Sequence, residues 1–86
     1  MTEQKLKQIF DLSSAAWKWF KKKDMTDVAA RDDYFWDLVT KDIKDMVKKC
    51  DKEFKEFYTN ILNTYAGQLQ KDYLAYLETK QERLPI

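Results

Sequence analysis

The chain has no histidine, and it has one cysteine, one glycine and one proline. Without histidine it lacks the commonest general base and the commonest metal ligand of proteins. A single glycine, Gly67, is too few for a glycine-rich phosphate loop, and a single cysteine, Cys50, has no partner for an internal disulfide. Glycine and proline are also the main residues of tight turns. Their scarcity argues against β-hairpins and predicts an all-α fold.

The residues that remain for chemistry have simpler interpretations. Cys50 falls on an apolar helical stripe with no histidine to activate it, which is typical of a buried and inert thiol. Five aspartates offer oxygen atoms that suit Ca²⁺ or Mg²⁺: Asp32, Asp33, Asp37, Asp42 and Asp45. Basic residues intersperse them and the spacing of a calcium loop is missing, so a solvated helix face is favoured. We therefore predict no enzymatic activity, no cofactor and no metal site.

Charge is distributed unevenly although the net charge is only +1. Residues 1–23 carry +4, residues 24–50 carry −2 and residues 51–86 carry −1. This pattern favours a basic helix lying near an acidic one, whereas a nucleic-acid or membrane partner would be better supported by a net basic domain. No apolar run approaches the roughly 20 residues of a membrane span. We expect a protein of the reducing cytoplasm with no membrane partner.

Apolar residues recur at intervals of three and four and predict three helices, at about residues 3–23, 32–50 and 52–81. Thr2 and Asp51 are placed to cap the first and third helices, and Val28-Ala29-Ala30 predicts a short extra turn before the second. Short connections make neighbouring helices antiparallel, so the predicted fold is a three-helix up-down bundle. Residues 1–82 form one domain, and residues 83–86 form a loose tail because Pro85 ends any helix before it.

The third predicted helix is too long for a compact body of this chain length. Thirty helical residues extend about 45 Å, whereas the body would be roughly 30 Å across. The helix either bends at Gly67 or projects with apolar side chains attached. The sequence leaves both possibilities open.

The predicted core takes one apolar stripe from each helix. On the first helix Trp17 and Phe20 belong to this stripe, whereas Trp19 lies to one side with Leu12. The predicted core residues are Leu6, Ile9, Phe10, Trp17, Phe20, Trp36, Val39, Ile43, Val47, Phe54, Phe57, Ile61 and Tyr65.

Several apolar residues are not used by the three stripes, and we interpret them as candidates for a protein interface. A contiguous apolar patch is unusual on a monomer and marks an interface, and 13 aromatic residues strengthen the case. The candidates are Leu12, Trp19, Tyr34, Leu38, Tyr73, Leu74, Tyr76 and Leu77. Tyr73, Leu74, Tyr76 and Leu77 lie near the end of the third predicted helix, where the same patch of a second copy could meet them, so a dimer is the favoured state. A host protein is the other partner considered. Burial of these residues on several sides of one monomer remains the alternative.

The predicted function is therefore that of a non-catalytic, self-associating interaction protein. The alternative is a nucleic-acid-associated protein that uses the basic end of the first helix. Its phosphate contacts would be Lys18, Lys21, Lys22 and Lys23, beside the aromatic residues of the segment AAWKWFKKKD.

Three segments in order along residues 4–80 carry a resemblance: LKQIFDLSSAAWKWFKKK, DYFWDLVTKDIKDMVKK and YLAYLETK. In this order and pattern the chain resembles small uncharacterised helical proteins of Firmicutes genomes and their prophages. The resemblance implies a bacterial or phage cytoplasmic protein. It implies no activity and no site residues.

Overall fold

The computed structural model describes residues 1–82 of the chain, which form three helices and two short 3₁₀ turns. The helices are α1 (Glu3–Asp24), α2 (Asp33–Lys49) and α3 (Lys55–Glu82), and the turns are η1 (Val28–Ala30) and η2 (Lys52–Phe54). No strand occurs within residues 1–82. The prediction of an all-α chain with three main helices is confirmed. The predicted loose tail at residues 83–86 lies outside the described residues.

Local capping explains where these elements begin. The Thr2 hydroxyl accepts a hydrogen bond from a backbone N–H of the first turn of α1, and the Asp32 carboxylate does the same for α2. Asp27 and Asp51 cap η1 and η2 in the same way. The predicted cap at Thr2 and the extra turn at Val28–Ala30 are confirmed, whereas Asp51 caps η2, the turn that leads into α3, and not α3 itself.

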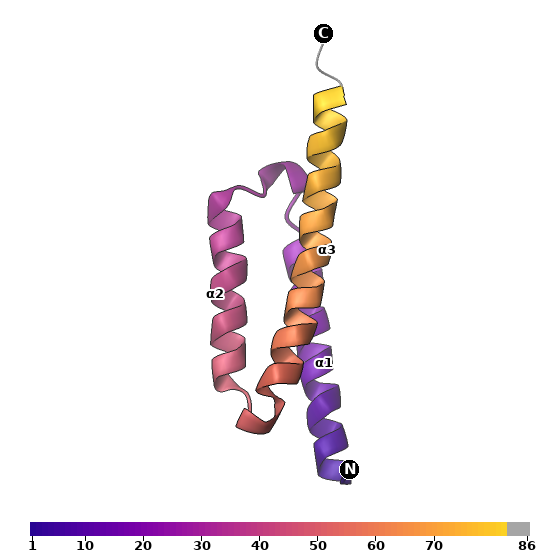
Figure 1. Cartoon of the computed structure of the whole chain (residues 1–86), viewed down its shortest axis with the longest axis vertical. Coiled ribbons are helices and arrows are strands. Elements are labelled where there is room, and N and C mark those ends of the chain that lie inside the picture. The colour runs from indigo at the N-terminus through magenta and orange to yellow at the C-terminus, as the bar shows by residue number, and fades with distance from the viewer. Residues whose placement is uncertain (83–86) are drawn as a thin grey trace.

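Figure 1 shows α1 and α3 running in the same direction along the long axis. α2, which lies between them in the sequence, runs in the opposite direction. α3 is the central element, because it packs against α1, α2 and both 3₁₀ turns. The molecule measures 60 × 21 × 19 Å. α3 continues through Gly67 as one helix, and its last turns extend beyond η1 (Figure 1). This projecting end consists of residues 73–82.

Two adjacent clusters form the core. The first contains Ala16 of α1 with Tyr58 and Leu62 of α3, and Ala16 and Leu62 are both 0% exposed. The second contains Phe35 and Val39 of α2 with Leu69 of α3. Trp19 packs against both clusters and so joins them.

The predicted core face of α1 is wrong at three positions. Leu6 is 52% exposed, Phe10 69% and Trp17 49%, and the predicted core residue Phe57 of α3 is 36% exposed. The cause is that α1 has a second row of apolar residues, and each member of that row precedes a position of the predicted stripe by one residue. α2 and α3 cover the seam that runs through Leu12, Ala16 and Trp19, so the neighbouring seam is left outside. Of the other predicted core residues, Val39 and Phe54 are buried, and a further set is half-buried: Ile9, Phe20, Trp36, Ile43, Val47, Ile61 and Tyr65.

Candidate interaction surfaces

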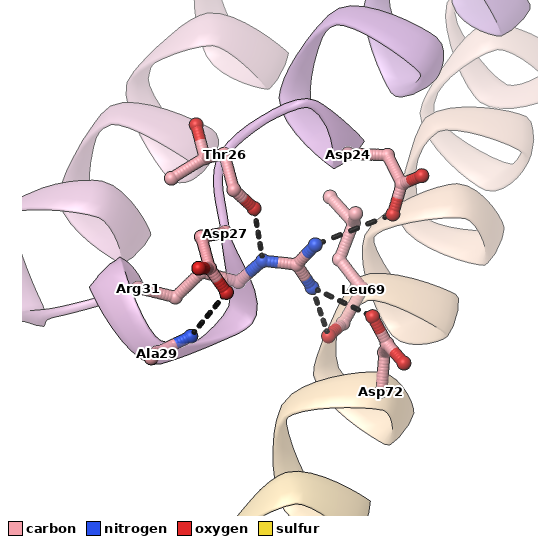
Figure 2. A network of polar contacts seen from close by, with 7 residues as sticks. All are labelled: Asp24, Thr26, Asp27, Ala29, Arg31, Leu69 and Asp72. Carbon is pink, nitrogen blue, oxygen red and sulfur yellow. Dashed lines mark hydrogen bonds and ion pairs between the residues drawn. The ribbon is translucent and has the colours of Figure 1, made fainter.

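Arg31, between η1 and α2, fastens the first connection of the chain to α3 (Figure 2). Its Nη1 donates to the main-chain oxygen of Leu69 at 3.1 Å and to Asp72 Oδ2 at 3.4 Å. Its Nη2 donates to Asp24 Oδ1 at 3.2 Å, and its Nε donates to the main-chain oxygen of Thr26 at 3.3 Å. One side chain thus ties the end of α1 and the connection to the middle of α3.

The guanidinium of Arg31 is 2% exposed, so its charge needs these acceptors. The two carboxylates that pair with it are 58% and 59% exposed, so they remain largely hydrated. Sequence reasoning missed this residue. The available signal was a lone arginine in a connection rich in aspartate, and the planar guanidinium suits several acceptors better than a lysine does.

The projecting end begins just beyond this clamp. The ring of Tyr73 meets Trp36 of α2 at 5.7 Å and Tyr76 at 6.4 Å between centroids. Within residues 1–80, α3 makes several ring contacts and side-chain hydrogen bonds with other elements. The contact between Tyr73 and Trp36 is the one nearest the C-terminal end of α3. Leu74 is 56% exposed, and Leu77 is half-buried. The four predicted interface residues of this segment therefore gather where α3 leaves the bundle.

A second apolar surface lies on α1, and we call it the outer face of α1: Leu6, Phe10, Ser13 and Trp17. It lies on the side of α1 that adjoins α3, because the next position of the same seam, Phe20, stacks on Tyr65 with centroids 4.8 Å apart. The Nζ of Lys21 sits 5.2 Å from the centroid of the Trp17 ring. Phe57 is the exposed apolar residue of α3 beside this face.

The other predicted interface residues have different environments. Leu12 and Trp19 pack against the core, and Trp19 Nε1 donates to Asp42 Oδ2 at 3.0 Å, so the prediction that they face outward is wrong. Leu12 and Trp19 face inward because α2 and α3 cover the side of α1 on which these two residues lie. Tyr34 is 70% exposed at the start of α2, whereas Leu38 is half-buried.

The four lysines proposed for phosphate contact are not equivalent. Lys18, Lys21 and Lys22 are exposed. Lys23 instead pairs with Asp42 Oδ2 at 2.8 Å and is 19% exposed. This pair joins the basic end of α1 to α2, although α2 itself is neutral, because its four aspartates are balanced by four lysines.

The fold acts on the pKa of Asp42 in two opposite directions. Partial burial is the largest single influence and acts to raise its pKa. Hydrogen bonds from Lys23 and Trp19, together with the lysine charges, outweigh burial, so the pKa of Asp42 is lowered from its ordinary value. At the other end of α1, a 2.7 Å hydrogen bond to Glu53 raises the pKa of Lys5.

Within the described part of the chain, no three Cys, Asp or Glu residues are placed to hold a metal ion. None of the described helices is both long and apolar enough to cross a membrane. Comparison of the chain with protein-family models, curated proteins and solved structures gave no match.

Proposed function

We propose that this chain is a non-catalytic helical interaction protein that pairs with a second copy through the projecting end of α3. The observation that carries the proposal is the position of Leu74, which is 56% exposed at the start of the part of α3 that extends beyond η1. Tyr73, Tyr76 and Leu77 accompany it on the same turns. The proposal takes the up-down order and the straight α3 of Figure 1 as the arrangement in solution.

The energetic argument concerns what pairing would bury. Fully burying a leucine or aromatic side chain stabilises by roughly 1.5–3 kcal/mol relative to leaving it in water. A two-fold arrangement lets the same patch of each copy cover the other, and it is the commonest symmetry of homo-oligomers. A short chain also has a small core, so pairing adds apolar burial that one copy lacks.

The test is the solution mass of the chain at micromolar concentration, measured by light scattering. We expect a dimer for the natural chain and a monomer for Leu74→Asp with Leu77→Asp. Tyr34→Asp is the matched control, because it places the same charge at a position 70% exposed outside the projecting end. That control should remain dimeric, and circular dichroism should show that all three chains keep their helix content.

A natural chain that stays monomeric ends the proposal, and so does a double variant that stays dimeric. Nucleic-acid binding through Lys18, Lys21, Lys22 and Lys23 is the less supported function, because Lys23 is engaged with Asp42. The resemblance to proteins of Firmicutes and their prophages supports a bacterial or phage cytoplasmic origin, and a host protein is the other partner that such an origin suggests.

A further inference from the structure

We infer that the outer face of α1 is a docking surface for an amphipathic helix of another protein, one whose apolar side chains are flanked by acidic residues. This surface is distinct from the projecting end of α3. The inference therefore stands or falls separately from the proposed dimer.

The spacing of the outer face identifies a helix as its occupant. Leu6, Phe10, Ser13 and Trp17 follow one another at intervals of four, three and four residues. This alternation is the seam of a helix that packs lengthwise against another helix. From Leu6 to Trp17 the seam rises about 16 Å, which is three turns.

Ser13 supplies a hole between the two large aromatic residues of the seam. Its side chain is small, and its hydroxyl already donates to the main-chain oxygen of Ile9 at 2.8 Å. A partner side chain can therefore cover Ser13 without leaving an unsatisfied hydroxyl.

Phe57 of α3 widens the apolar surface at the level of Phe10. The register follows from two contacts: Lys5 bonds to Glu53 near the start of both segments, and Ala16 packs against Tyr58 and Leu62 further along. Phe10 is 69% exposed, Trp17 49% and Phe57 36%. At the usual 150–250 Å² of an aromatic side chain, these three leave roughly 300 Å² in water. Apolar patches of this size on a monomer are often functional.

Charge selects the chemistry of the partner. Lys7, Lys18 and Lys21 are exposed and lie within roughly 110° of the seam on the helical projection. Glu3 lies on the same side and the exposed Asp11 lies next to Lys18 on the projection, so the lysines outnumber the acids. On the α3 flank, Asn60 and Thr64 are uncharged, Glu53 pairs with Lys5, and Glu56 is an exposed acid. Two copies meeting through this face would bring the same lysines together. A helix with acidic flanks would instead pair with them, so a different protein with that chemistry is the better fit.

The inference can be tested with two synthetic three-heptad peptides that share leucine at their core positions. One carries glutamate at the flanking positions and the other carries lysine. Fluorescence anisotropy of the labelled peptides measures binding to the full chain. We expect the acidic peptide to bind about tenfold or more tightly than the basic one, with a preference that weakens as salt is added.

Two pairs of variants assign the binding to the outer face of α1. Phe10→Ser with Trp17→Ser should abolish binding of the acidic peptide. Met25→Ser with Tyr34→Ser, two exposed apolar positions outside both proposed surfaces, should leave binding unchanged. Lys18→Glu with Lys21→Glu should invert the preference, so that the basic peptide binds more tightly.

Four results would overturn the inference. They are equal binding of both peptides, no binding of either, retained binding in Phe10→Ser with Trp17→Ser, and no inversion by the charge-swapped chain. If Phe10→Ser with Trp17→Ser instead converts a dimer to a monomer, a second copy occupies the face. If a short DNA duplex competes for Lys18 and Lys21 with a steep salt dependence, the lysines bind phosphate.

Discussion

Trp17 and Trp19 lie two residues apart on α1 and have opposite environments. Trp19 packs against both core clusters and donates a hydrogen bond to Asp42. Trp17 is 49% exposed, with the Lys21 ammonium over its ring. Two residues turn a helix by about 200°, so the two rings point to opposite sides. α1 therefore carries two apolar seams, and within residues 1–82 one is covered while the other is largely exposed from Leu6 to Trp17.

The largest expected effect comes from truncating each tryptophan in turn. Trp19→Ala removes the ring that joins the two clusters and leaves a cavity, so it should lower the free energy of unfolding by about 3–5 kcal/mol. Trp17→Ala should lower it by about 1 kcal/mol or less, because half of the ring is already in water. Urea denaturation of both variants measures the difference.

Trp19→Phe keeps a six-membered aromatic ring but loses the donor to Asp42 together with the five-membered ring of the indole. Its cost should therefore lie between those of Trp17→Ala and Trp19→Ala, at about 1–3 kcal/mol. Equal costs for Trp17→Ala and Trp19→Ala would show that the two seams are covered alike.

Introducing a leucine into each seam should change the free energy of unfolding by different amounts, and this difference should be smaller than that between the two tryptophan variants. Ala16 is 0% exposed where α1 and α3 meet, so Ala16→Leu overpacks that contact and should cost about 1–3 kcal/mol. Ser13→Leu adds the same side chain to the half-buried outer seam, where space is available, and should change the free energy of unfolding by less than about 0.5 kcal/mol. Thermal and urea unfolding compare them. A Ser13→Leu chain as unstable as Ala16→Leu would mean that the outer seam is closed.

Local signals were enough to predict the elements of this fold. Thr2 and Asp51 act as caps through side-chain oxygens and backbone N–H groups two or three residues away, which a single stretch of sequence contains. Val28-Ala29-Ala30 formed the expected extra turn, although Asp27 caps it and not Asp24 or Thr26, the two candidates that the sequence offered.

The choice of seam on α1 could not be predicted in this way, because it depends on where α2 and α3 lie. Both seams of α1 have apolar residues at helical spacing, and the seam with the larger aromatic residues, Phe10 and Trp17, is the one left outside. Ala16 is small, yet its size is what lets α1 approach α3 closely. Arg31 was missed because its acceptors on α3 are 38 and 41 residues away in the chain.

The candidate surfaces were predictable to different extents. Helix length alone indicated an end that projects or folds back, and the structure places Tyr73, Leu74, Tyr76 and Leu77 on a helix that continues past η1. The outer face of α1 is not predictable in the same way, because the helical spacing of Leu6, Phe10 and Trp17 equally fits a core stripe.

The smallest expected change in the free energy of unfolding concerns Asp42. This acid accepts a hydrogen bond from Trp19 and pairs with Lys23, two residues on the covered side of α1. Its pKa in the folded chain lies below the ordinary value of 3.8. A lowered folded-state pKa contributes stability that is present above the unfolded value and is lost as pH falls through the folded value. Asp42→Asn keeps an oxygen that can accept hydrogen bonds but removes the charge. It should therefore cost about 1 kcal/mol near neutral pH, discounted for partial exposure.

That difference should shrink as pH falls below the ordinary value of 3.8, because Asp42 itself then becomes protonated. Urea denaturation of both chains at each pH measures it. Asp45→Asn is the matched control, since it removes an exposed acid from the same helix, and it should alter the free energy of unfolding little. A cost of Asp42→Asn that stays constant with pH would show that the charge of Asp42 does not hold the covered side of α1 in place.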